Sequence, residues 1–190
     1  SNEGGTGKVD LRMLRPTPDE RSLEILSGED ASSVFGQYYT APKPDRPEAN
    51  GHRVMISPSE PRANDVFLTV MQMSEEGVPE LPVDLVELPA AFVLTLADRA
   101  VVLSRTGALL EQGFEVEVKG EGERQLLVTG LTPGAWSIRS GDGEVEYNAQ
   151  VKERRNTAFF VVPAGAYAIR PEAISGAAEY EAPEDIMPTM

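Results

Sequence analysis

His52 is the only histidine in the chain, so it is the only imidazole that could act as a base near neutral pH. Arg53 follows it directly and could face an anionic group. The same pattern also fits a partly exposed histidine at the start of a strand, because Val54 and Ile56 share its face. Base catalysis also needs an acid and a charge-neutralising group. We therefore favour the structural interpretation and predict no catalytic residue.

Three other aromatic residues are candidates for carbohydrate binding. Tyr38 and Tyr39 are adjacent and could supply a phenolic acid or a platform for a sugar ring. With Phe35 nearby, the favoured alternative is that they anchor a long loop. Trp136 follows a Pro-Gly turn and could stack on a sugar. A lone tryptophan in a β protein more often fills the core, where it contributes a large apolar area, and this alternative is favoured.

Metal and cofactor sites find little support in the sequence. The chain contains no cysteine, which excludes thiolate metal sites and disulfides. Glu48, Glu60 and Asp65 are close in sequence but lack the fixed spacing of a calcium loop, and Asp142 falls in a predicted turn. We predict no metal and no cofactor, with weak calcium binding at acidic turns as the alternative.

The charge of the chain restricts its partners. Acidic residues number 31 against 17 basic ones, giving a formal net charge of −14. An excess of this size argues against binding nucleic acid or an anionic membrane surface. It also argues against a strong basic stripe for sulfated or uronic polymers. We therefore expect neither nucleic acid nor membrane as a partner.

The elements that position these residues are predicted to be strands. Phe114, Val116 and Val118 alternate with charged residues, which is typical of a half-buried strand. Similar short segments recur every 8–12 residues between turn signals. We therefore predict an all-β antiparallel sandwich of about ten strands with minimal helix, at most a turn at residues 107–112.

The turns and the core follow from the same pattern. Residues 97–99 should make a tight hairpin, residues 120–123 should break a strand, and residues 163–165 should close a final hairpin. The apolar run at residues 66–73 should be a central strand covered on both faces. The expected core consists of Phe67, Val70, Phe92, Leu94, Val116, Leu126, Val128, Ile138, Phe159, Val161 and Ile169.

The predicted domain organisation is simple. Residues 1–7 are expected to form a flexible lead-in or a scar left by cloning or cleavage, and residues 8–173 a single β-sandwich domain. Residues 174–190 are acidic and expected to be a loosely ordered tail, free or docked on a partner.

Three segments taken together resemble the C-terminal β region of heparinase II/III-like polysaccharide lyases. Residues 52–72 follow the order strand, Ser57-Pro58, Pro61, Asp65, strand, which is similar to a passage near the end of those enzymes. The strand that ends at Pro16 looks like the one before that passage. Residues 127–136 and 159–169 look like the family's terminal strands, so the resemblance covers roughly residues 8–171.

The resemblance implies a non-catalytic role. In that family an α/α toroid packs on an antiparallel β-sandwich and supplies most catalytic residues. A further histidine comes from β strands upstream of the matching region. The resemblance therefore implies a bacterial, secreted module, in the periplasm or outside the cell, that packs against the toroid of its parent protein, with a polysaccharide as a further partner. The alternative is an autonomous carbohydrate-binding or adhesive module, with Tyr38, Tyr39, His52, Arg53 and Trp136 as candidate binding residues.

Overall fold

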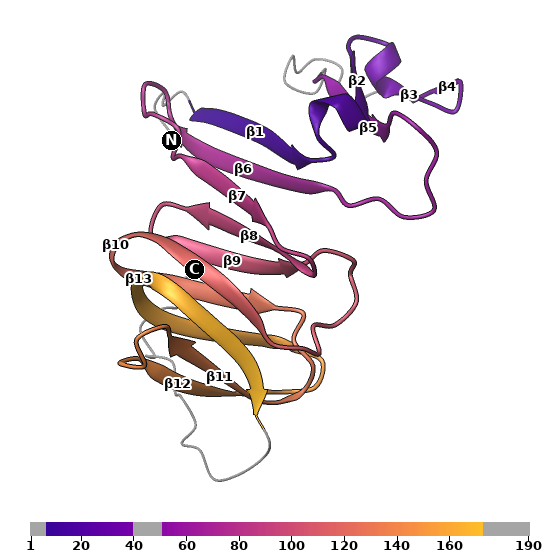
Figure 1. Ribbon diagram of the computed structural model, residues 1–190. Helices are drawn as coiled ribbons and strands as arrows, with labels where there is room; N and C mark the ends of the chain where they lie inside the picture. The colour runs from indigo at the N-terminus through magenta and orange to yellow at the C-terminus, as the bar shows by residue number, and fades with distance from the viewer. Residues whose placement is uncertain (1–6, 40–50, 173–190) are drawn as a thin grey trace. The chain divides into compact units, whose positions relative to one another are not determined.

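A computed structural model describes residues 7–39 and 51–172 of the chain. It divides into two compact units, Ser1–Glu75 (unit 1) and Glu76–Met190 (unit 2). The described residues hold thirteen strands and two three-residue 3₁₀ turns, at Pro18–Glu20 and Asp30–Ser32 (Figure 1). The prediction of an all-β sandwich with minimal helix is confirmed.

Unit 1 consists of three separate two-stranded antiparallel ribbons. They pair β1 (Gly7–Arg15) with β6 (Leu68–Glu75), β2 (Arg21–Leu26) with β5 (Arg53–Pro58), and β3 (Ser33–Val34) with β4 (Gln37–Tyr38). Among the described residues of unit 1, only Pro16 and Val70 are buried. The ribbons therefore form almost no apolar core within the described part of unit 1.

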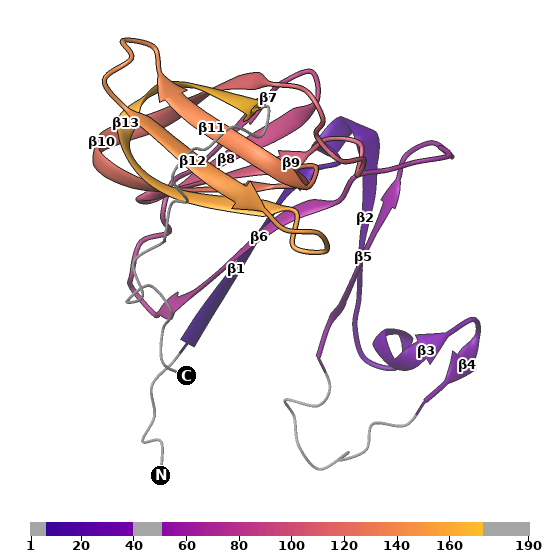
Figure 2. The ribbon, with the colours of Figure 1, turned by 90° about the horizontal axis from the view of Figure 1, so that it is seen from below.

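Unit 2 contains one seven-stranded sheet that folds over into two layers. Its order is β12-β11-β13-β10-β9-β8-β7, and Figure 2 shows β11 and β12 in front of β7, β8 and β9. The bounds are β7 (Val83–Glu87), β8 (Ala91–Leu96), β9 (Arg99–Ser104), β10 (Phe114–Thr129), β11 (Gly134–Ser140), β12 (Glu146–Val151) and β13 (Thr157–Glu172). All pairs are antiparallel except β9 with β10, where Gln125 to Val128 run parallel to residues 99–102.

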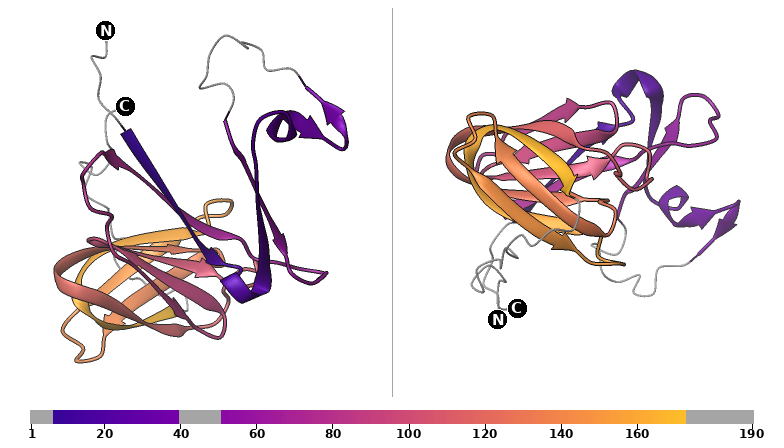
Figure 3. Two further views of the ribbon diagram at one scale, coloured as in Figure 1. Left: turned by 90° about the horizontal axis from the view of Figure 1, so that it is seen from above. Right: turned by 60° about the horizontal axis from the view of Figure 1, so that its bottom comes forward.

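Two long strands, β10 and β13, carry the chain from one layer to the other. Val118 lies opposite Gly165 and Glu123 opposite Pro163, so β10 has four residues in its bulge where β13 has one. The strands curve together at one side of the sandwich (Figures 2 and 3). The first half of β10 and the last half of β13 belong to one layer, and the remaining halves to the other.

This bend corrects two predictions. Residues 120–123 do not end a strand and residues 163–165 do not close a hairpin, because both lie within continuous 16-residue strands. Gly120 and Gly122 have φ of +116° and +68°, which strand residues with a side chain rarely adopt. Glycine therefore marks a bulge and a bend here, with no reversal of the chain.

The core of unit 2 lies between the two layers. Its cluster includes Trp136, Phe160, Leu126, Ile138 and Ile169, all at or below 1% exposure. Seven predicted core residues are buried: Val70, Phe92, Val116, Leu126, Val128, Ile138 and Ile169.

Four predicted core residues are placed differently. Phe159 and Val161 are half-buried, because β13 turns Ala158, Phe160 and Val162 inward, and Leu94 of β8 is half-buried next to the buried Val93. Phe67 is exposed and lies just before β6.

Three local predictions can also be compared with the structure. The hairpin at residues 97–99 is confirmed, since Leu96 pairs with Arg99 across the turn. Residues 107–112 form no helical turn, because Leu110 bridges to Leu131 in extended geometry. The strand predicted at residues 66–73 is β6, which pairs with β1 alone among the described strands and is not covered on both faces.

The domain boundaries stay a prediction. Of the lead-in predicted at residues 1–7, residues 1–6 lie outside the described residues and Gly7 is the first residue of β1. The tail at 174–190 also lies outside the described residues. Whether residues 8–173 behave as a single domain is likewise a prediction that the two compact units leave open.

Candidate functional site

The candidate tyrosines lie on the short ribbon of β3 and β4. Ser33 pairs with Tyr38, and Phe35 and Gly36 form the two-residue turn with positive φ. Tyr38 and Tyr39 are 52% and 54% exposed, and Phe35 at the turn is fully exposed. The Tyr39 hydroxyl lies 3.3 Å from Gln37 Oε1. This ribbon presents three exposed aromatic rings. The loop that they were predicted to anchor lies at residues 40–50, outside the described residues, so the anchoring role stays a prediction.

His52 and Arg53 approach the same part of unit 1 from β5. His52 is exposed and precedes β5, which begins at Arg53 and not at His52 as predicted. Arg53 Nη2 donates to the carbonyl of Asp30 at 3.3 Å. The backbone of Tyr39 donates to Ser32 at 3.0 Å. The 3₁₀ turn Asp30–Ser32 therefore holds both candidate segments.

Trp136 is removed from the set of candidate binding residues. Its side chain is 1% exposed within the core of unit 2, and its indole Nε1–H donates to the Thr132 carbonyl at 2.9 Å. Sugar stacking needs an open indole face, which a fully buried ring does not have. The alternative of core packing fits its position.

Among the described residues, the candidate residues of unit 1 form no acid–base pair. Within the described part of the chain, His52 makes no hydrogen bond with a carboxylate, and the exposed tyrosines lie on a different ribbon. Within residues 7–39 and 51–172, no group of three histidine or acidic side chains could hold a metal ion. The exposed rings of Phe35, Tyr38 and Tyr39 are open to stacking on a ligand ring or to packing against an apolar surface.

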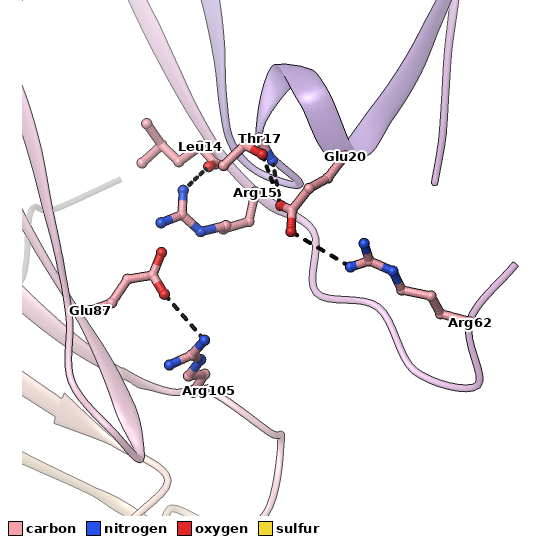
Figure 4. A network of polar contacts seen from close by, with 7 residues as sticks. All are labelled: Leu14, Arg15, Thr17, Glu20, Arg62, Glu87 and Arg105. Atoms are coloured by element: carbon pink, nitrogen blue, oxygen red, sulfur yellow. Dashed lines mark hydrogen bonds and ion pairs between the residues drawn. The ribbon is translucent and has the colours of Figure 1, made fainter. Parts of the chain in front are cut away.

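A network of hydrogen bonds and one ion pair holds the turn between Pro16 and the start of β2. The backbone and hydroxyl of Thr17 donate to Glu20 Oε2 at 3.1 and 2.9 Å, and Arg62 lies 3.7 Å from the other oxygen (Figure 4). These hydrogen bonds, with a smaller contribution from Arg62, lower the pKa of Glu20. In unit 2 the same figure shows Arg105 paired with Glu87 at 3.3 Å. Both arrangements are structural pairings of exposed charges.

The feature that sequence reasoning missed is an exposed apolar face on β1 and β6. Val9 lies opposite Met73 and Leu11 opposite Met71, which places all four side chains on one face. They are between 49% and 78% exposed. The signal was present, because Val9 and Leu11 alternate with charged neighbours, but alternation predicts an apolar face and does not say what covers it. We call these four residues the β1–β6 apolar face.

The second large ribbon of unit 1 repeats this arrangement. Leu23, Ile25 and Val54 are about half exposed, and Ile25 lies directly opposite Val54. Of the large hydrophobic side chains that are exposed in the described chain, only Val78, Leu81 and Leu109 belong to unit 2. Exposed apolar surface is therefore concentrated on unit 1, and such surface marks interaction sites.

Comparison with known proteins agrees with the fold of unit 2. Residues 85–171 match the family model of the heparinase II C-terminal domain, a span that runs from β7 to the end of β13. No curated protein matches the chain. No helix in the described part of the chain is long and apolar enough to cross a membrane. The sandwich formed by residues 85–171 is therefore similar to the heparinase II C-terminal domain, which supports the resemblance found in the sequence.

Proposed function

We propose that the chain is a non-catalytic C-terminal β module of a heparinase II/III-like polysaccharide lyase. It packs against the catalytic α/α toroid domain of the same parent protein, and it works in the bacterial periplasm or outside the cell. Two observations support the proposal: the family match of residues 85–171 and the exposed apolar surface of unit 1.

The β1–β6 apolar face carries the packing part of the proposal. Six of the eight residues at positions 66–73 are apolar, which is typical of a strand that is covered on both faces. In the structure β6 pairs only with β1 among the described strands, and Met71 and Met73 are exposed. A two-stranded ribbon is marginally stable in water on its own. Burial of this face against a partner domain would supply the missing stabilisation.

The absence of catalysis is proposed from the candidate residues themselves. Lyase chemistry on a uronate needs a base, a proton donor and a group that neutralises the carboxylate. The chain has one histidine, His52, which is exposed and next to an arginine whose Nη2 is bonded to a backbone carbonyl. The expected result is no turnover of heparin, heparan sulfate or alginate, followed by the ultraviolet absorbance of unsaturated uronate. Turnover that is lost in His52→Ala would refute this part of the proposal.

The packing is tested by a binding assay with the α/α toroid of the parent lyase, produced as a separate polypeptide. Leu11→Asp and Met71→Asp place a carboxylate in the β1–β6 apolar face, and each should weaken binding at least tenfold. Val78→Asp is the matched control, because Val78 is an exposed apolar residue of unit 2. Circular dichroism checks that each variant keeps its strand content.

The results separate three outcomes. Selective loss in the two unit 1 variants supports packing through this face. Wild-type binding in both variants refutes the face, and no binding by the unaltered chain refutes the packing role.

The second candidate, an autonomous carbohydrate-binding or adhesive module, has one specific observation in its favour. Phe35, Tyr38 and Tyr39 present exposed rings on one short ribbon, and aromatic faces can stack on sugar rings. Affinity electrophoresis against acidic and neutral glycans tests it. Retardation that is lost on changing Tyr38 and Tyr39 to alanine would favour this candidate, whereas unchanged mobility on every glycan would leave the packing role.

A further inference from the structure

The first half of β10 has a strand on only one side. Residues 114–118 pair with β13, in which Phe114 lies opposite Ile169 and Val118 opposite Gly165. The parallel pairing with β9 involves only Gln125 to Val128. No other described strand pairs with residues 114–118. Alternate backbone N–H and C=O groups of this segment therefore face away from β13 along an open sheet edge.

A groove runs along this edge of unit 2. Its larger part encloses about 920 Å³ and is lined by Leu88, Ala91, Leu110 and Phe114 among others. A smaller part of about 290 Å³ continues along Glu115, Val116 and Glu117, beside Val86 and Val93. Consecutive strand residues point to opposite faces. A groove that contacts three of them in a row must lie beside the edge of the strand.

The groove is apolar within and acidic along its rim. Glu111, Glu115 and Glu117 line it, and among the described residues Arg170 is the only basic one that does. Arg170 Nη2 lies 3.7 Å from Glu115, so it offsets one of the three carboxylates. The rim therefore carries a net negative charge, which favours basic groups on whatever occupies the groove.

The lining also explains how Arg170 is held. A Cβ atom at position 113 would lie 2.8 Å from Arg170 Nη1 and 3.0 Å from the carbonyl oxygen of Ile169. Gly113 thus leaves room for the arginine side chain to lie across the start of β10. At the other end of the open segment, Lys119 reaches Asp84 of β7 at 2.7 Å. The contacts of Arg170 and of Lys119 therefore lie at the two ends of the acidic segment that contains Glu115 and Glu117.

We propose that residues 114–118 bind an extended segment of a partner protein in which apolar and basic side chains alternate. The partner strand continues the sheet through backbone hydrogen bonds, as in other cases of strand addition. Its apolar side chains enter the groove beside Val116 and Phe114, and its basic side chains lie near Glu115 and Glu117. This surface is separate from the β1–β6 apolar face and does not depend on the lyase assignment.

The probe is a blocked octapeptide of alternating valine and lysine, titrated into the full chain and followed by amide chemical shifts. Saturable shifts concentrated at residues 113–118 are expected, with weaker binding of a valine–glutamate peptide. A valine–lysine peptide with an N-methyl group on every residue cannot donate to the edge from either of its own edges and should not bind. Equal binding of the N-methylated peptide would refute strand addition.

Charge reversal provides the sharper test. Glu115→Lys with Glu117→Lys should invert the preference, so that the valine–glutamate peptide binds more tightly than the valine–lysine peptide by about three- to tenfold. Glu144→Lys with Glu153→Lys is the matched control, because both residues are exposed in turns away from the groove. An unchanged preference in the groove variant, or the same inversion in the control, would overturn the proposal, as would shifts that avoid residues 113–118.

Discussion

Replacing Phe160 by alanine tests which face of β13 forms the core. Phe160 is fully buried opposite Leu126 and belongs to the core cluster, whereas its neighbour Phe159 is half-buried opposite Leu127 on the other face. Removing a buried phenyl ring costs about 3–5 kcal/mol of the free energy of unfolding, because a cavity remains in the core. Phe159→Ala is the matched control and should cost about 1 kcal/mol.

The fluorescence of Trp136 reports the unfolding transition of unit 2. Trp136 is the only tryptophan of the chain and lies in the same core cluster, so its fluorescence follows the unfolding of unit 2. With a urea m-value of about 1–2 kcal/mol/M, Phe160→Ala should lower the unfolding midpoint by about 1.5 M or more, and Phe159→Ala by about 1 M or less. If Phe160→Ala does not fold, the leucine pair Phe160→Leu and Phe159→Leu gives the same comparison. An equal or larger loss at Phe159 would show that the inward face has been assigned one residue out of register.

Two further predictions concern the bulge of β10 and the turn before β12. Gly120→Ala should lower the free energy of unfolding by about 1–3 kcal/mol, because φ at Gly120 is +116° and the new methyl group would meet the Arg124 guanidinium. Gly141→Ala, at a turn with open space around the new methyl group, is the control and should change the free energy of unfolding little. Equal urea midpoints for the two variants would refute the strain at Gly120. The Ser140 hydroxyl and the Glu144 N–H lower the pKa of Asp142, so its contribution to stability is present above the ordinary carboxyl pKa and is lost as pH falls through the lowered value. Asp142→Asn should therefore unfold with a weaker dependence on acid pH, and identical pH profiles for the two chains would contradict the assignment.

Alternation predicted the strands of unit 2 because each strand there has one inward face. Val116, Leu126 and Ile138 are buried as their spacing requires. Alternation failed at residues 157–162, where four apolar residues in a row, Phe159 to Val162, give both faces the same character. Pairing with β10 selects Phe160 and Val162, and pairing is not visible in a local pattern.

The candidate site was less predictable than the fold. The sequence favoured core packing for Trp136, and Trp136 is buried, but it favoured a packing role for Tyr38 and Tyr39 as well, and both are exposed. Residue type alone does not separate a buried aromatic ring from an exposed one. It also could not indicate the open edge at residues 114–118. That edge depends on β9 pairing only with the second half of β10, through contacts between distant residues.

The bend shared by β10 and β13 has a consequence for the order in which unit 2 folds. Phe114 must find Ile169 and Thr129 must find Thr157, so each half of the ribbon requires the closure of a long loop before it gains any contact. Structures dominated by such distant pairings fold slowly. Because both strands run through both layers, neither layer is complete until β13 has been added. The last of the described strands is therefore the one that converts two partial sheets into a cooperative domain.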